Sequence, residues 1–419
     1  MKFCLVTTFL PPYHFGGDGV FVANLANLLV ANGHRVQIVH CRVSFDALGG
    51  RASTSDRFLD PRVLVHSLES KWGPLSPMLT QISGYPCTKH GTLERILSQD
   101  FDVVHWHNVS LVAGAGGLRL GKGVRLCTAH DYWWICPTHI LFKYDGAVCR
   151  ERECLKCVLA HHRPPQPWRA GGWLGKQLRN LDRFLVPSEF AASVYRNSGL
   201  GMPVTVLRHF VAPTPQDPAG GFDSEPGYYL VVGRMEEFKG IQTILPLFKK
   251  PGRRLKIAGT GSFESNLMRQ AAGNPQVEFL GKIDQRNLSS LYANARATLV
   301  PSICWETFGL TIIESLQHQT PAIVSDYGAL PEQIRHTGGG WVYRDLDELS
   351  VLLDCLDEQP GIARDRGVAG CSALAQFSPE TYLRRYLEII DEERRHQAAS
   401  TGRPVVENPI GEQVGFPGE

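Results

Sequence analysis

Short apolar runs recur along almost the whole chain, and a helix-length stretch separates each run from the next. The first run, residues 3–8, is followed by a glycine-rich loop, a helical stretch at about 20–31 and a second apolar run at 35–40. Strands joined by helices run parallel and are buried on both faces. The alternation therefore predicts an α/β protein built from doubly wound, Rossmann-like parallel sheets.

The alternation breaks once, in a segment rich in Pro, Gly and Asp (APTPQDPAGGFDSEPG), and then resumes. A chain of 419 residues suggests two or three domains at about 150 residues each. We therefore expect an N-terminal domain at 1–212, a linker at 213–227 and a C-terminal domain at 228–378. A last helix is expected at 379–400, and the tail at 401–419 lacks periodicity and is expected to be mobile.

Charge and hydropathy exclude several classes of protein. Lys and Arg number 43 against 41 Asp and Glu, a net charge of +2, so no nucleic-acid partner is expected. A hydrophobic content of 43 % argues against a largely disordered chain. The apolar run at the N-terminus ends at two prolines, which makes it too short for a signal sequence or a membrane span. We expect a cytoplasmic protein.

Two glutamates in the second half mark the most informative segment, ICWETFGLTIIES. Glu306 lies in the loop after an apolar run, where its carboxylate can accept hydrogen bonds from sugar hydroxyls. Phe308 and Gly309 open a helical stretch, and a helix N-terminus suits a phosphate. Glu314, in the early turns, could bind a ribose, although a glutamate favoured by the helix dipole is the alternative.

Cations and glycines end other strands of the same half. Arg234 and Lys239 follow the run YYLVVG, and two cations five residues apart can straddle a diphosphate. The alternative is a solvated loop in which Glu236 and Glu237 neutralise them. Gly259 and Gly261 follow the next run and would allow close approach of a ligand to the backbone. Open α/β sheets bind ligands at these strand ends.

Taken together, these segments resemble the retaining glycosyltransferases of family 4, with Glu306 and Glu314 as the E-x7-E motif. The resemblance spans nearly the whole chain, through the GGDG loop, the His130-Asp131 pair, VPSEF, GRxxxxKG, GTG and WETFGLTIIES. It implies the GT-B fold, in which two Rossmann-like domains face each other across a cleft and a C-terminal helix returns to the first domain.

The resemblance also implies roles for single residues. Arg234 and Lys239 would bind the donor diphosphate and stabilise the leaving group, Glu306 would hold the transferred sugar, and Glu314 would bind the ribose. His130 would lie near the reaction centre, as a general base or in an orienting or core role. The expected donor-binding positions are Gly16, Gly17, Arg234, Lys239, Gly259, Gly261, Lys282, Ile283, Glu306, Phe308, Gly309, Leu310 and Glu314, of which Lys282 and Ile283 would line the base pocket.

Family members are taken to react with retention, by a front-face substitution that needs no metal. The resemblance therefore implies that catalysis needs no cofactor. We expect a nucleotide-sugar donor, with a UDP-sugar as first choice and a GDP-sugar as second. The acceptor would be a glycan, a lipid-linked saccharide or a small natural product.

Acceptor recognition is expected in the first domain. The candidate residues flank the glycine loop or end a strand, and they are Tyr13, His14, His107 and Asp131. A basic stretch with Trp168 and Trp173 could rest on an anionic membrane, which would suit a lipid-linked acceptor, although a solvated face is the more common origin of such a pattern.

Four of the eleven cysteines gather in an insertion at about 136–162. Cys136, Cys149, Cys154 and Cys157 meet the ligand count of a structural zinc site, and two disulfides or four free thiols are the alternatives.

Two other functions fit the sequence less well. A non-catalytic nucleotide-sugar-binding module would be free to lose part of the set Arg234, Lys239, Glu306 and Glu314, which is intact. An oxidoreductase would need a G-x-G-x-x-G turn, which Gly16, Gly17 and Gly19 do not make.

Overall fold

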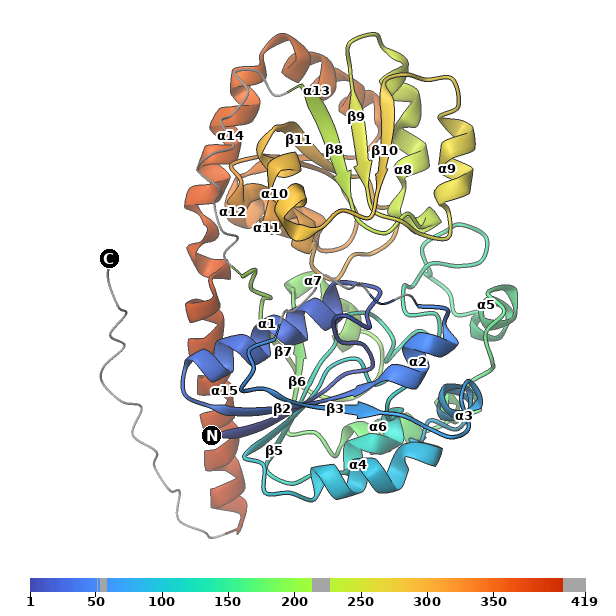
Figure 1. Cartoon of the computed structure of the whole chain (residues 1–419), viewed down its shortest axis with the longest axis vertical. Coiled ribbons are helices and arrows are strands. Elements are labelled where there is room, and N and C mark those ends of the chain that lie inside the picture. Colours follow the sequence, from blue (N-terminus) through green and yellow to red (C-terminus); the bar gives the residue numbers. More distant parts are fainter. Residues whose placement is uncertain (51, 53–58, 213–226, 402–419) are drawn as a thin grey trace.

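The computed structural model describes residues 1–50, 52, 59–212 and 227–401, which form two α/β domains and a long C-terminal helix (Figure 1). The predicted linker, apart from its last residue, and the predicted tail, apart from Thr401, lie outside the described residues.

The N-terminal domain holds a sheet of seven parallel strands in the order β3-β2-β1-β4-β5-β6-β7. The strands are β1 (Lys2–Val6), β2 (Arg35–Cys41), β3 (Leu64–Leu68), β4 (Val103–Trp106), β5 (Val124–Thr128), β6 (Arg183–Val186) and β7 (Val204–Val206). The helices are α1 (Gly17–Ala31), α2 (Arg42–Ala47), α3 (Leu75–Ser83), α4 (His90–Leu97), α5 (Cys154–Ala160), α6 (Trp173–Leu178) and α7 (Glu189–Arg196).

The C-terminal domain repeats this plan with six parallel strands, in the order β10-β9-β8-β11-β12-β13. The strands are β8 (Tyr228–Val232), β9 (Leu255–Ala258), β10 (Val277–Gly281), β11 (Ala295–Val300), β12 (Ala322–Ser325) and β13 (Gly340–Tyr343). The helices are α8 (Ile241–Ile244), α9 (Glu264–Gln270), α10 (Gln285–Ala293), α11 (Leu310–Gln317), α12 (Leu330–Thr337), α13 (Leu346–Glu358), α14 (Pro360–Ser372) and α15 (Pro379–Thr401).

Short 3-10 turns occur at Cys87–Lys89, Ala115–Arg119, Pro167–Arg169, Glu237–Lys239, Leu245–Lys249 and Leu374–Phe377. In both sheets the first strand in sequence lies between the second and the fourth, so the strand order reverses beside it. Open α/β sheets bind ligands at such switch points. In the C-terminal domain the switch point lies between β8 and β11, the strands that precede Arg234 and Glu306.

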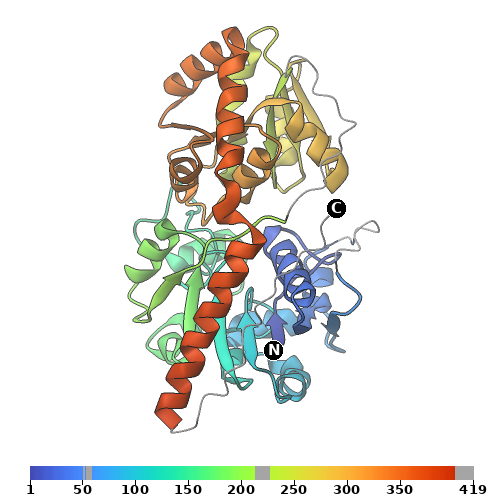
Figure 2. The same cartoon turned by 90° about the vertical axis from the view of Figure 1, so that its left-hand side faces the viewer.

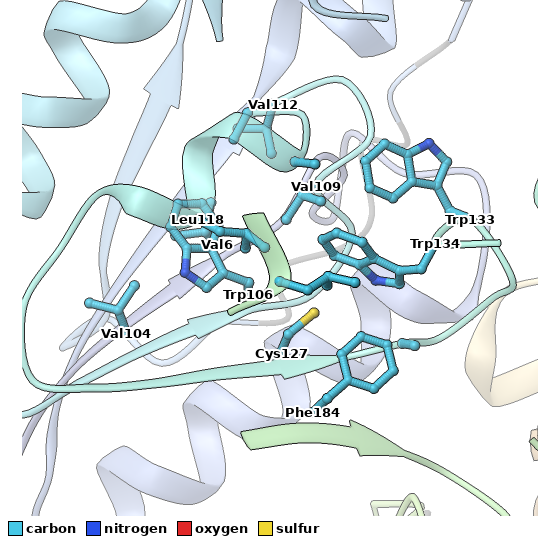
Figure 3. Packing of buried hydrophobic residues seen from close by; sticks show 14 of the residues in the cluster. Val6, Val104, Trp106, Val109, Val112, Leu118, Cys127, Trp133, Trp134 and Phe184 are labelled. Atoms are coloured by element: carbon cyan, nitrogen blue, oxygen red, sulfur yellow. The ribbon is translucent and has the colours of Figure 1, made fainter. Parts of the chain in front are cut away.

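Alternate residues of β1 supply two cores, because successive side chains of a strand point to opposite faces of the sheet. Phe3 and Leu5 pack on one face, whereas Cys4 and Val6 pack on the other with Trp106. Figure 3 shows the second core, where Trp106, Trp134 and Phe184 surround Cys127. Both faces of the sheet are therefore covered, as continuous apolar strands predict.

Trp168 and Trp173 belong to this second core, which corrects the idea that they could rest on a membrane. Both are partly buried against the core, and the indole Nε1 of Trp168 donates to the carbonyl of Gln81 at 2.9 Å. The guanidinium of Arg169 lies over the rings of Trp133 and Trp168, 4.9 and 4.5 Å from their centroids. The tryptophans therefore face inward.

Helix α15 crosses from the C-terminal domain to the N-terminal domain and runs along it (Figure 2). Tyr386, Ile389 and Ile390 are fully buried in the core that contains Phe3. The hydroxyl of Tyr386 lies 2.8 Å from Nδ1 of His105, and Arg394 pairs with Asp102 at 2.5 Å. The helix thus serves as part of the N-terminal core.

Replacing Ile390 with alanine tests how much this docking stabilises the fold. Removing a fully buried branched side chain leaves a cavity, so Ile390→Ala should lower the free energy of unfolding by about 2–5 kcal/mol. Arg395→Ala, at an exposed position on the same helix, should change it by less than about 0.5 kcal/mol. Urea denaturation measures both, and equal effects of the two substitutions would contradict the docking.

Candidate active site

An ion pair stands at the switch point of the C-terminal domain. Nζ of Lys239 lies 2.6 Å from Oε1 of Glu306, and the hydroxyl of Ser302 donates to the same oxygen at 2.6 Å. Lys239 ends the turn after β8, and Glu306 lies in the loop after β11. The neighbouring position of these two strands brings together residues 67 positions apart in sequence.

The charge of Glu306 depends on its partners. Burial by itself would raise the pKa of this carboxyl group, but Lys239, Ser302 and Arg234 together hold the pKa below its usual value. Glu306 is therefore an anion at neutral pH. One carboxylate oxygen carries both hydrogen bonds described above, which leaves acceptor capacity for ligand hydroxyls.

Arg234 is half exposed and pairs loosely with Glu236, at 4.0 Å. The side chains of Arg234 and Lys239 lie on the ring of Phe238, each 5.9 Å from its centroid. The turn thus presents two cations around one aromatic ring. Glu236 neutralises Arg234 only weakly at this distance.

Helix α11 begins at Leu310, after Gly309, whose φ of 94° is in the region that favours glycine. Phe308, just before it, is buried against Phe377 and His209, so only its backbone can face a ligand. Glu314 lies in the second turn of the helix and accepts a hydrogen bond from the hydroxyl of Tyr292 at 3.0 Å. Burial raises the pKa of Glu314, and the Tyr292 hydroxyl opposes that rise.

Neighbouring backbone leaves no room for a side chain at Gly259 or Gly261. A Cβ at Gly259 would stand 1.9 Å from the carbonyl oxygen of Gly233, and one at Gly261 would stand 2.3 Å from that of Met235. The turn after β9 is thus packed on the turn that carries Arg234. Lys282 and Ile283, beyond β10, are exposed and partly exposed at the same edge of the sheet.

The glycine loop of the N-terminal domain reaches this region. A Cβ at Gly17 would stand 3.1 Å from the side chain of Leu310, so the start of α1 abuts the start of α11. Nδ1 of His14 lies 3.1 Å from the carbonyl oxygen of Gly16, and the ring of Tyr13 stacks on the ring of His40. Among the described residues, neither Tyr13 nor His14 forms a hydrogen bond with His130 or Asp131.

Three histidines of the N-terminal domain form a hydrogen-bonded chain. Nδ1 of His107 lies 2.9 Å from Nε2 of His130, and Nδ1 of His130 lies 3.0 Å from Nε2 of His209. Burial lowers the pKa of His130, although Asp18 and Asp131 oppose it, so all three rings are neutral at pH 7. Both nitrogens of His130 are engaged, and the geometry therefore suits an orienting role better than that of a general base.

Both carboxylate oxygens of Asp131 also have hydrogen-bond partners. Its Oδ1 accepts the N–H of Trp133 at 2.9 Å, and its Oδ2 lies 2.9 Å from Nδ1 of His139. Burial would raise the pKa of Asp131, but His139 and the Trp133 amide lower it overall. A small pocket opens beside the pair, and His107, His130, Asp131 and Trp133 line it. Two of the four residues expected on the acceptor side, His107 and Asp131, thus line one pocket.

Four residues of the site were not expected from the sequence. Thr307 donates from Oγ1 to the carbonyl of His130 at 2.7 Å, and Ser188 donates to the carbonyl of Thr307 at 2.7 Å. Glu332 accepts hydrogen bonds across the domain junction, and His209 completes the histidine chain. Ser188 lies in the VPSEF segment that carries the resemblance, but a sequence gives no signal for partners this distant along the chain.

The cysteine insertion gives no support to a metal centre. Cys149 follows a hairpin at Phe142 and Val148, and Cys154 and Cys157 lie in α5. All four cysteines are free, and no group of three or more His, Cys, Asp or Glu side chains within the described ranges is arranged to hold a metal ion. The ring of Phe142 lies 6.4 Å from that of Phe238, so the insertion contacts the turn with the two cations.

Two family descriptions match the chain, Glycosyltransferase Family 4 over residues 15–214 and Glycosyl transferases group 1 over residues 214–351. Phosphatidyl-myo-inositol mannosyltransferase of Mycobacterium leprae is 30 % identical over 382 residues, which are 87 % of this chain and 91 % of the relative. The chain belongs to glycosyltransferase family 4.

Other curated relatives match over shorter stretches. An uncharacterized glycosyltransferase of Methanocaldococcus jannaschii is 32 % identical over 29 % of this chain and 33 % of its own length. O-antigen chain mannosyltransferase B of Escherichia coli is 30 % identical over 37 % of this chain and 43 % of its own length. In both cases the match spans less than half of the relative.

Solved structures confirm the predicted fold. Sucrose-phosphate synthase from Thermosynechococcus elongatus has a TM-score of 0.68 at 19 % identity, over 95 % of this chain and all of that one. HepE of Anabaena, in complex with UDP and glucose, has a TM-score of 0.67 at 15 % identity, over 94 % of this chain and all of that one. The two domains have the GT-B fold of the family. In the part of the chain that the structure describes, no helix is both long and apolar enough to span a bilayer.

The Lys239–Glu306 pair makes a pH-dependent prediction. Lys239→Met leaves the carboxylate without its cation, so the variant should be less stable than the wild type by about 1–3 kcal/mol at pH 7. In the wild type the low pKa of Glu306 contributes stability above the unfolded-state pKa, and this stability is lost as the pH falls through the folded-state value. In the variant, burial without Lys239 favours the neutral carboxyl group, so Glu306 takes up its proton at a higher pH than in the wild type and loses its unpaired charge. The difference between the two proteins should therefore shrink between pH 7 and pH 4.

Urea denaturation at a series of pH values measures this difference. The double variant Lys239→Met, Glu306→Gln is the control, because it removes the unpaired charge and should show a smaller dependence on pH. A difference that stays constant from pH 7 to pH 4 would contradict the ion pair.

Proposed function

We propose that this protein is a retaining glycosyltransferase that moves a sugar from a nucleoside diphosphate sugar to an acceptor hydroxyl. The observation that carries the proposal is the Lys239–Glu306 pair at a switch point, next to Arg234 and the N-terminus of α11. A cationic site for a diphosphate thus adjoins an anionic site for sugar hydroxyls. Such an arrangement fits a sugar linked to a diphosphate, which carries both kinds of group.

The residues proposed to bind the donor contact different parts of it. Arg234 and Lys239, with the free amides at the start of α11, stabilise the negative charge that develops on the departing diphosphate. Glu306 holds hydroxyls of the transferred sugar, and Glu314, beside Tyr292, accepts from the ribose. A ribose hydroxyl bound to Glu314 would favour its charged form and so oppose the effect of burial.

The reaction is a front-face substitution. The acceptor oxygen forms its bond to the anomeric carbon on the face from which the diphosphate leaves. The bond between this carbon and the diphosphate oxygen breaks, and its electron pair goes to the diphosphate. The departing phosphate oxygen takes the proton of the acceptor hydroxyl. His130, held between His107 and His209, orients the sugar.

A UDP-sugar is the favoured donor and a GDP-sugar the second candidate. Support for UDP comes from HepE, whose complexes contain UDP and UDP-glucose. Support for GDP comes from a Mycobacterium tuberculosis relative described as GDP-mannose-dependent, 44 % identical over 20 % of this chain. A lipid-linked or glycan acceptor is supported by the names of the Mycobacterium leprae and Escherichia coli relatives.

A donor screen tests the proposal. UDP should raise the melting temperature of the wild type more than GDP or ADP does, because a ligand that binds only the folded state stabilises it. With the matching nucleotide sugar the wild type should release nucleoside diphosphate, and Glu306→Ala should reduce kcat about 10²–10³-fold. Binding of the nucleotide without any turnover would favour a non-catalytic module, and binding of no nucleotide would contradict the proposal altogether.

Metal requirements are tested separately. Because the leaving group is stabilised by Arg234, Lys239 and a helix N-terminus, treatment with EDTA should change the rate of donor hydrolysis less than about twofold. Elemental analysis of the purified protein before EDTA is added decides the zinc hypothesis for Cys136, Cys149, Cys154 and Cys157, which predicts one zinc per chain. Loss of turnover that returns with Mg²⁺ would contradict the metal-independent mechanism.

A further inference from the structure

Glu332, in the C-terminal domain, completes the N-terminus of a helix in the other domain. Its two carboxylate oxygens accept the backbone N–H groups of Glu189 and Phe190, each at 3.0 Å. These are the first two residues of α7, and Glu332 itself is 5 % exposed. The first N–H groups of a helix have no partner within the helix, and an anion placed there also favours the helix dipole.

The N-terminal domain satisfies only part of this helix end by itself. Ser188, the N-cap residue, accepts the N–H of Ala191 at 3.0 Å. The amides of Glu189 and Phe190 find their partner across the domain junction. A carboxylate from the facing domain therefore supplies the rest of the cap, and separating the domains would leave the amides of Glu189 and Phe190 without this partner.

The same junction holds the loop that carries Glu306. The N–H of Ala329, three residues before Glu332, donates to the carbonyl of Glu306 at 2.9 Å. Next to Glu306, Thr307 is bonded on both sides to the N-terminal domain, through Ser188 and the carbonyl of His130. On the other side of Glu306, the ring of Trp305 lies 5.6 Å from that of Phe190.

We propose that Glu332 is a positioning residue for sugar transfer, because it locks α7 of the N-terminal domain onto the loop that holds Glu306. The inference rests on the proposed function of that loop. The charged groups proposed to bind the nucleotide, Arg234, Lys239 and Glu314, all lie in the C-terminal domain, and Gly16 and Gly17 of the N-terminal domain meet α11 away from Glu332, so nucleotide binding should depend little on this lock. Orientation of the sugar against His130 does depend on it, because His130 belongs to the other domain.

The test compares Glu332→Ala with Arg335→Ala, an exposed position on the same helix. Glu332→Ala should lower kcat for hydrolysis of the donor found in the screen by about 10²-fold, since small misplacement of reacting groups has effects of this size. Its affinity for UDP, or for GDP if the screen selects it, should change less than about threefold. Glu332→Gln keeps one hydrogen-bond acceptor but loses the charge, so its kcat should lie between those of the wild type and Glu332→Ala. Arg335→Ala should match the wild type.

Amide hydrogen exchange gives a readout that does not need activity. In the wild type the amides of Glu189 and Phe190 should be protected, and in Glu332→Ala they should exchange more than about tenfold faster. Unprotected amides in the wild type, or a kcat of Glu332→Ala within threefold of the wild type, would overturn the inference. A wild type that turns over no nucleotide sugar would overturn the proposed function instead, and the exchange measurement would then decide the lock by itself.

Discussion

The candidate donor site depends on one charge pair, Lys239 with Glu306, at the point where the order of the strands reverses. Burying the Glu306 carboxylate without a cation beside it would cost free energy, and Lys239 supplies that cation. Lys239 keeps Glu306 ionised and is itself held at the end of the turn after β8. The neighbouring features, the turn of Phe238 and the glycines of the next loop, hold this pair in place.

A second constraint comes from the junction between the domains. The loop around Glu306 has its backbone bonded to the C-terminal domain through Ala329 and to the N-terminal domain through Thr307. A site of this kind is complete only when both domains are present in this arrangement. The long helix α15 supports the arrangement, since its aromatic and branched residues are part of the N-terminal core.

Sequence reasoning predicted the alternating fold because it depends on local pattern. The apolar run of β1 and the glycines before α1 and α11 can be recognised in a few residues of sequence. It expected Gly259 and Gly261 to allow close approach of a ligand, and it gave no sign that the backbone of Gly233 and Met235 leaves no room for a Cβ at either position. It also placed Trp168 and Trp173 at the surface, because charge and aromatic content do not reveal which core a side chain joins.

The sequence by itself determined the two parallel sheets, the strand ends that carry Arg234, Lys239, Glu306 and Glu314, and the family. These follow from hydrophobic periodicity and from residues a few positions apart. Only the tertiary structure decided that His130 is held between two other histidines, that Asp131 is engaged by His139, and that Glu332 caps a helix of the facing domain. The bonds of His130 and Glu332 join residues far apart in the chain, so their partners are set by how the sheets and domains pack, and the bond of Asp131 depends on the irregular loop that brings His139 back to it.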